Sequence, residues 1–279
     1  MAERSAPAPF AAFAAKRPGP APSRLSGLSP LSFALWVAVG ALILASLGDV
    51  APSPQRLVDG GPRMARLLSR MWPPETDPAF LLRMFWSIVE TLQIALVGAA
   101  FGIVLSVPIA WASARGVTPF GPFAFLFKGI TSLARTVPDL VWALIFVSAV
   151  GLGAVAGTMT IMMDTLGFCG RFFAEAMEET EPEPRQALEA IGAGRMGVLL
   201  GAVIPDAAPS MINAALFAFE KAVRSSVVLG LVGAGGIGQE LKTAFDLFQY
   251  RQAAAIILAV FVIVIAMEWL ADRLRARLR

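Results

Sequence analysis

Long apolar runs separated by polar stretches dominate the pattern of this chain. A helix that crosses the roughly 30 Å hydrocarbon core of a bilayer needs about 20 apolar residues. The pattern therefore predicts an all-α polytopic membrane protein with about six transmembrane helices. The expected spans lie at residues 31–48, 87–112, 138–151, 154–170, 209–232 and 253–270. The third and fourth runs are short, and Asp139 and Asp164 lie near their ends, so their limits stay open.

The polar stretches divide the chain into segments. Residues 1–30 are rich in Ala, Pro and Ser and carry four basic residues, which is typical of a disordered basic tail. A cleaved signal peptide is the alternative, although the basic lead is long for one. The first span, 31–48, precedes a Pro-rich loop at 49–86, and 87–279 forms a five-helix core. The largest polar insertion of that core lies at 171–206.

The loop at 49–86 contains a short amphipathic piece. Its apolar residues Leu67, Leu68, Met71 and Trp72 share one helical face, opposite a set of arginines. Such a segment can lie along a membrane surface. It can equally pack on the rest of the protein, and the sequence leaves both readings open.

Composition and charge narrow the class of protein. The chain is 57% hydrophobic and 15% charged, with a mean hydropathy of +0.69, whereas soluble domains average about 25% charged. With both termini inside, the cytoplasmic segments hold fourteen Lys and Arg and the outer segments seven. The positive-inside rule therefore places both termini in the cytoplasm, and this use of the basic residues argues against a nucleic-acid partner.

The sequence lacks the usual elements of catalysis and metal binding. It has no histidine, a single cysteine (Cys169) and no phosphate-binding loop of the G-x-x-x-x-G-K-[ST] type. We therefore expect no catalytic residue, no metal and no cofactor in this chain. Glycines form a G-x-G-x-x-G pattern, but it follows a span and lies in no βαβ unit, so a dinucleotide site is not expected. We interpret these glycines as a close-packed hinge or turn: Gly233, Gly235, Gly236 and Gly238.

Three charged residues fall inside the fifth expected span. Glu220 and Arg224 are four residues apart and can pair along one helix face. One interpretation is an ion pair that locks helices together; the other is that Arg224, with Ser225 and Ser226, lines a translocation path. The guanidinium of an arginine offers several charge-assisted hydrogen-bond donors. Lys221 is expected to point elsewhere and to snorkel toward the membrane surface.

A milder polar stripe lies in the second span. Glu90 and Gln93 are three residues apart and so share a helix face. Lining of the path and hydrogen bonding between helices both fit, and the structural reading is favoured.

The polar insertion contains a short expected helix that begins at two prolines and ends at glycines. An ordinary solvated loop is the plain alternative. The segment resembles the signature of ABC importer permeases, an E-A-A block followed by a glycine and a closing I-x-L-P. Gln186-Ala187-Leu188 takes the first place, Gly192 the glycine place and Val203-Ile204-Pro205 the last, with Gln and Leu as departures from the pattern. The resemblance assigns docking on an ATPase subunit to Gln186, Ala187, Leu188, Glu189, Gly192, Ala193, Arg195 and Pro205.

Two further blocks narrow the resemblance. Residues 135–146 and 224–241 are similar to permeases of phosphonate ABC transporters, and the likeness covers about residues 80–279. Permeases for phosphite and similar oxyanions share these patterns. The resemblance implies a type I, MetI-like core that carries phosphonate or a related phosphorus oxyanion.

The resemblance also implies partners and a location. It predicts a homodimer in the bacterial inner membrane, two ATPase subunits that bind ATP and Mg²⁺, and a periplasmic phosphonate-binding protein. In this reading the chain is a transporter subunit and not an enzyme. A permease of the same architecture for another solute, a channel and an integral membrane enzyme are the alternatives.

Overall fold

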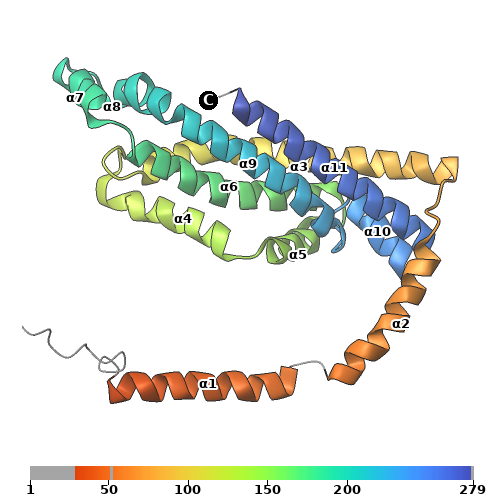
Figure 1. The fold of residues 1–279 in the computed structure, drawn as a ribbon. Helices are drawn as coiled ribbons and strands as arrows, with labels where there is room; N and C mark the ends of the chain where they lie inside the picture. Colours follow the sequence, from red (N-terminus) through yellow and green to blue (C-terminus); the bar gives the residue numbers. More distant parts are fainter. Residues whose placement is uncertain (1–28, 51–52, 278–279) are drawn as a thin grey trace, which may run out of the picture. The chain divides into compact units, whose positions relative to one another are not determined.

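The computed structural model describes residues 29–50 and 53–277, so the expected tail at 1–30 lies almost entirely outside the described residues. Over the described residues the chain forms helices and no strand (Figure 1). The α-helices are α1 (Pro30–Val50), α2 (Pro54–Met71), α3 (Pro78–Ser113), α4 (Ala124–Thr136), α5 (Asp139–Val150), α6 (Ala154–Glu178), α7 (Pro182–Ala190), α8 (Arg195–Val198), α9 (Ile204–Gly230), α10 (Ile237–Asp246) and α11 (Tyr250–Ala276). A 3₁₀ turn at Gly121–Phe123 precedes α4, and a π turn at Leu199–Val203 joins α8 to α9.

The chain divides into two units, Met1–Arg63 and Met64–Arg279. The first unit contains α1, a uniformly apolar helix whose large side chains are exposed all round, and the beginning of α2. The second unit is a bundle built from α3 to α11. The bundle holds the buried core of the protein, so the site is sought there.

Among the residues that the structure describes, four helices are long and apolar enough to cross a membrane. They are Pro30–Gly48, Pro78–Ser113, Arg195–Gly230 and Tyr250–Ala276. A fifth candidate is the pair Gly121–Thr136 and Asp139–Val150, which is bent by 93°. By itself α5 has 12 residues, about 18 Å at 1.5 Å per residue, so the third expected span is too short to cross alone. The helix at the fourth expected span, α6, is 25 residues long and carries Asp164 and Arg171.

The insertion expected at 171–206 is more helical than the sequence indicated. Helix α6 continues to Glu178, and α8, the π turn and α9 form one rod that begins at Arg195. The glutamates at the end of α6 suggest a loop. Phe173 and Met177 nevertheless recur at helical spacing and are buried in the core, which keeps this stretch helical.

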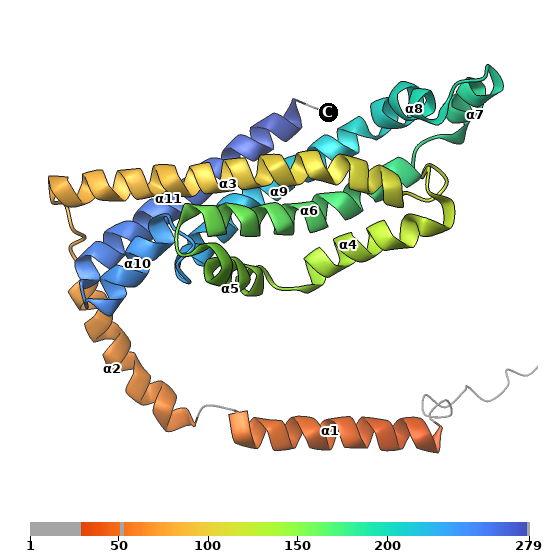
Figure 2. The same ribbon diagram turned by 180° about the vertical axis from the view of Figure 1, so that it is seen from behind.

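Helices α3 and α6 lie side by side along much of their length (Figure 2) and make the most extensive helix contact in the bundle. Gly98 and Gly102 of α3 form a G-x-x-x-G seam that faces Ile161 and Thr165 of α6. A Cβ built on Gly98 would lie 2.7 Å from the Cβ of Ile161, and one on Gly102 would lie 2.6 Å from the Cβ of Thr165. Small residues at such a seam let two backbones approach closely, which drives helix association in lipid.

Many large apolar side chains point away from the bundle. Examples are Phe101 and Val104 of α3, 58% and 68% exposed, and Phe261 and Val262 of α11, each 64% exposed. Large exposed apolar surfaces mark contacts with other proteins or with a membrane. This surface suits a lipid solvent.

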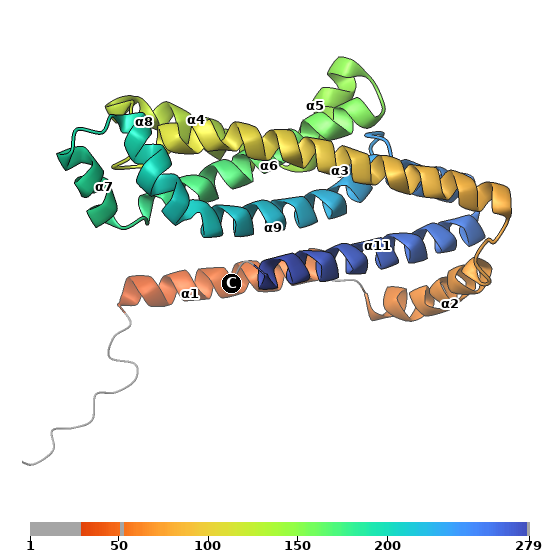
Figure 3. The ribbon, with the colours of Figure 1, turned by 90° about the horizontal axis from the view of Figure 1, so that it is seen from above.

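The two ends of the bundle differ. Helices α7 and α8 form one end, while α10 and the first turns of α11 and α3 lie at the other (Figure 3). The last turns of α11 point back toward the end that carries α7 and α8 (Figures 1 and 2). The arrangement separates the α7 segment from the α10 segment by the length of the bundle.

Replacing Gly102 by leucine is expected to destabilise the bundle by about 1–3 kcal/mol, because the added side chain must displace Thr165 or the backbone of α6. Thermal unfolding of the detergent-solubilised protein measures the loss. Gly129→Leu in α4 is the matched control, since a Cβ there meets nothing within 4 Å. Equal melting temperatures for the two variants would contradict the role of the seam.

Candidate functional site

Helix α7 is a short helix with defined limits. Pro182 stands in its first turn, where the missing N–H costs nothing. Gly192 ends it with φ +85°, a conformation that strains any residue with a Cβ. The N–H of Gly192 donates to the carbonyl of Glu189 at 2.9 Å, and that of Ala193 to Leu188 at 3.0 Å, so the turn satisfies carbonyls at the end of the helix.

One side of α7 packs against the bundle, and the other side is exposed. Leu188 and Ala193 pack against the core cluster that contains Val198 and Leu199. Gln186, Ala187, Glu189 and Gly192 are exposed, and so are Arg195 at the start of α8 and Pro205 in the first turn of α9. Ile191 is 80% exposed, which is unusual for a large apolar side chain beside a charged helix. The eight residues assigned to docking thus lie within one segment at the end of the bundle.

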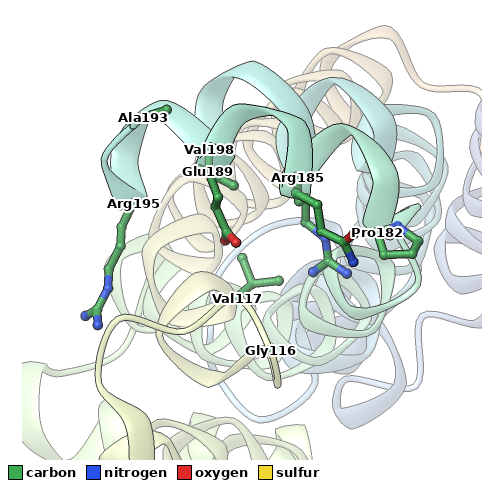
Figure 4. Close-up of a pocket in the computed structure, with 9 residues that line it drawn as sticks. Gly116, Val117, Pro182, Arg185, Glu189, Ala193, Arg195 and Val198 are labelled. Atoms are coloured by element: carbon green, nitrogen blue, oxygen red, sulfur yellow. The ribbon is translucent and has the colours of Figure 1, made fainter. Parts of the chain in front are cut away.

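A cavity of about 240 Å³ lies beneath this segment (Figure 4). Arg185 and Glu189 point from α7 toward Val117 of the α3–α4 connection (Figure 4). The Nη1 of Arg195 donates to the carbonyl of Pro119 at 2.7 Å. The lining combines four charged or polar residues, Arg185, Gln186, Glu189 and Arg195, with Gly116, Val117, Pro182, Ala193 and Val198. These contacts tie α8 to the α3–α4 connection, a link that the sequence alone did not indicate.

A second group of charged residues lies on α9. The Oε1 of Glu220 accepts from the Nη2 of Arg224 at 2.8 Å, so the pairing expected from the four-residue spacing is present. Its Oε2 accepts from the Nη2 of Arg275 in α11, also at 2.8 Å. The Glu220 side chain is 10% exposed, whereas Arg224 is 56% exposed. The sequence did not indicate the role of Arg275, because no sequence signal shows that α11 returns to α9.

Lys221 does not snorkel, so that expectation is wrong. Its Nζ lies 2.7 Å from the Oδ1 of Asp164 in α6, whose side chain is 15% exposed. The ammonium also lies 5.9 Å from the ring centroid of Phe168. A carboxylate inside an apolar bundle needs a cation nearby, and this need holds Lys221 against α6.

The two serines after Arg224 contact neighbouring helices. The Oγ of Ser225 donates to the Oδ2 of Asp139 at 3.2 Å, at the start of α5. Ser226 is buried, and its Oγ donates to the carbonyl of Thr91 in α3 at 3.2 Å. Both hydroxyls therefore join α9 to other helices. Of the three residues expected to line a path, Arg224 is the exposed one.

The glycine segment forms the turn between α9 and α10. Gly233, Gly235 and Gly236 have positive φ, and the backbone of Gly238 lies against the carbonyl of Val227 too closely for any side chain. A Cβ on Gly235 would lie 2.9 Å from the Oε1 of Glu90, so Glu90 borders the turn.

Gln93, the other member of the expected stripe on α3, is exposed. Within the described residues no group of three or more His, Cys, Asp or Glu is placed to hold a metal ion. The chemistry that this arrangement offers is ion pairing and hydrogen bonding.

Comparison with known sequences identifies the protein family of this chain. Residues 102–279 match the family described as the binding-protein-dependent transport system inner membrane component. The phosphate-import permease protein PhnE of Mycolicibacterium smegmatis is 37% identical over 222 residues, 80% of this chain and 41% of that protein. The phosphite transport system permease protein PtxC of Stutzerimonas stutzeri is 36% identical over 222 residues, 78% of this chain and 79% of that one.

Comparison with solved structures supports the same fold. The crystal form of the MetNI methionine ABC transporter in an inward-facing conformation aligns with a TM-score of 0.63. The alignment covers 74% of this chain and 100% of that chain at 20% identity. The likeness shows a shared MetI-like arrangement of helices.

Replacing Lys221 by methionine is expected to destabilise the bundle by about 1–3 kcal/mol, because the carboxylate of Asp164 keeps its burial and loses its cation. Thermal unfolding in detergent is the measurement. Lys242→Met is the matched control: it removes the cation of an exposed pair with Asp246, which is worth less than about 1 kcal/mol.

The exchange Asp164→Lys with Lys221→Asp should recover part of the loss, since it rebuilds the pair with opposite polarity. A melting temperature no lower for Lys221→Met than for Lys242→Met would argue against a pair that joins α6 and α9.

Proposed function

Because this chain belongs to the family of binding-protein-dependent transport system inner membrane components, we propose that it forms the translocation path of an ATP-driven importer for a phosphorus oxyanion. Phosphonate is the proposed substrate, with phosphite as the related alternative. The main support for this substrate class is the names of two relatives, a phosphate-import permease and a phosphite transport permease. The blocks at 135–146 and 224–241, which resemble phosphonate permeases, support it.

Helix α7 is the proposed contact with the ATPase subunit. It is exposed on one side and anchored through Leu188 and Ala193 on the other, so a force applied to it reaches the core. It stands in the connection between α6 and the rod that continues as α9. A shift of α7 therefore acts on two core helices at once. The small residues Ala187 and Gly192 leave room for close approach of another protein.

The proposed assembly is a homodimer of this chain with two ATPase subunits and a periplasmic binding protein. ATP and Mg²⁺ bind to the ATPase subunits, and this chain supplies the path without bond-making chemistry. The end that carries α7 faces the cytoplasm, as do both termini, in agreement with the excess of basic residues in those segments. The end that carries α10 faces the periplasm.

Arg224 is the proposed contact with the anion inside the path. Its side chain is 56% exposed, and its guanidinium belongs to a group in which the Glu220 carboxylate pairs with two arginines. Arg275 also pairs with Asp272 at 3.1 Å, so two arginines face two carboxylates, and Arg224 shares its carboxylate with an arginine that has a second partner. A phosphorus oxyanion would gain charge-assisted hydrogen bonds from such a group.

Uptake experiments test the substrate. Cells that carry the chain with its ATPase and binding protein should accumulate labelled 2-aminoethylphosphonate, and cells without the gene should not. Phosphite, phosphate and methionine serve as parallel substrates in the same strains. If the cells accumulated methionine but none of the phosphorus compounds, the proposed substrate would be wrong, whereas the proposed importer architecture would stand.

Breaking α7 is expected to abolish transport and leave the bundle folded. In Gln186→Pro the ring removes a helical N–H in the last turns of α7 and clashes with the preceding turn. We expect uptake to fall by about tenfold or more. A tenfold fall corresponds to a loss of about 1.4 kcal/mol in the free energy that couples the ATPase to transport. The readouts are substrate uptake and substrate-stimulated ATP hydrolysis by the reconstituted complex.

Control variants distinguish the effect of breaking α7 from the effect of losing one side chain. Gln186→Ala removes the same side chain and keeps the helix, so its uptake should fall much less than that of Gln186→Pro. Gly192→Ala strains the turn at φ +85°, whereas Gly194→Ala at φ −70° does not, and neither added Cβ meets an atom within 4 Å. Undiminished uptake by Gln186→Pro would remove the coupling assignment.

A further inference from the structure

Helix α2 is amphipathic to an unusual degree, and the transport function leaves it unexplained. With 100° per residue, Arg63, Arg66 and Arg70 fall within an arc of about 60° on one side of the helix. Val58, Met64 and Leu68 fall on the other side. These three apolar side chains are 73%, 57% and 58% exposed. Trp72, which follows the helix directly and continues the apolar face, is 74% exposed.

The sequence of α2 is a poor helix former in water. It contains the run Gly60-Gly61-Pro62 in its interior, and glycine and proline are the two least favourable residues there. A helix of this length is marginal in water even without them. Its helical state therefore needs a surface that covers the apolar face.

The neighbouring spans indicate which surface is within reach. The candidate span of α1 ends at Gly48, and the candidate span of α3 begins at Pro78. Five residues separate Gly48 from the start of α2, and six separate its end from Pro78. At about 3.3–3.6 Å per extended residue, both connections keep α2 within roughly 20 Å of the bilayer. The lipid surface is thus available to α2 at both of its ends.

We propose that α2 lies in the plane of the membrane surface, with Val58, Met64, Leu68 and Trp72 among the acyl chains and its arginines at the phosphates of the lipid headgroups. The dimensions agree. A helix with side chains is about 10–12 Å across, and the headgroup region is about 5–7 Å deep on each side. A helix centred at the hydrocarbon boundary therefore places Arg63, Arg66 and Arg70 at phosphate level. Guanidinium groups bind phosphate through paired hydrogen bonds.

The leaflet to which α2 is assigned follows from the orientation given under the proposed function. Helix α3 starts at the end of the bundle opposite α7 (Figure 3). With α7 in the cytoplasm, α2 lies on the periplasmic leaflet.

Spin labels in the full-length chain test the inference. Cys169 is buried and is replaced by alanine, and single cysteines are introduced at Met64, Leu68, Arg63 or Arg70. The protein is reconstituted in vesicles of phosphatidylethanolamine and phosphatidylglycerol. Collision rates are measured with oxygen, which concentrates in lipid, and with a water-soluble nickel chelate. We expect a severalfold higher ratio of oxygen to nickel collisions at Met64 and Leu68 than at Arg63 and Arg70.

Two sites in the chain calibrate the scale. Val104 of α3, 68% exposed on an apolar span, supplies the lipid value, and Ala187 on α7 supplies the water value. High nickel collision rates at all four α2 sites would overturn the inference, because the helix would then lie in water. Shielding of Met64 and Leu68 from both reagents would also overturn it, because another protein surface would cover the apolar face.

A membrane-impermeant maleimide tests the side separately. Reaction with Arg70→Cys in intact cells, after the outer membrane is permeabilised, is expected for the periplasmic leaflet. Reaction that requires lysis would overturn the periplasmic placement and with it the topology of the proposed function. The spin-label ratios are independent of that outcome, so failure of the topology and failure of the lipid contact are distinguishable.

Discussion

A charge inside an apolar bundle must find its partner within the protein, and this constraint organises the helices around α9. Lipid offers no counterion, so an unpaired ionised group there is costly. Lys221 of α9 meets Asp164 of α6, and Glu220 of α9 meets Arg275 of α11. Each pair joins two helices that are far apart in sequence. These pairs hold α9 against α6 and α11.

The same pairs bear on how motion would pass through the chain. Helix α7 stands between α6 and the rod that continues as α9, and the Lys221–Asp164 pair joins those same two helices deeper in the bundle. A displacement of α7 cannot draw α6 and α9 apart without separating this pair. The glycine seam at Gly98 and Gly102 holds α3 to α6 in the same way, through close backbone packing. The core therefore resists shear and is suited to move as one body.

Whether a feature of the fold or of the site could be predicted from the sequence depends on how far apart along the chain the interacting residues lie. Local signals worked: apolar runs predicted most of the long helices, and the prolines and Gly192 predicted the limits of α7. The pair of Glu220 with Arg224 followed from its spacing along one helix. The partners of Lys221 and Glu220 on α6 and α11 did not, because Asp164 and Arg275 lie more than fifty positions away. Glutamates at the end of α6 hid an amphipathic pattern, so an insertion was expected where the helix continues.

The ion pairs around Arg224 bear on its proposed role in the path. Glu220 accepts from Arg224 through one oxygen and from Arg275 through the other, so Arg224 shares this carboxylate with a second guanidinium. Arg275 also reaches Asp272 at 3.1 Å, but that carboxylate is 68% exposed, and water screens such contacts. If Arg224 lies in the path, as proposed, an anion there would meet a guanidinium that shares its carboxylate with Arg275. That carboxylate would also limit how strongly the anion is held, because it competes for the same donors. Conduction requires binding that is favourable enough to enter and weak enough to leave, and a shared carboxylate is a direct way to set that balance.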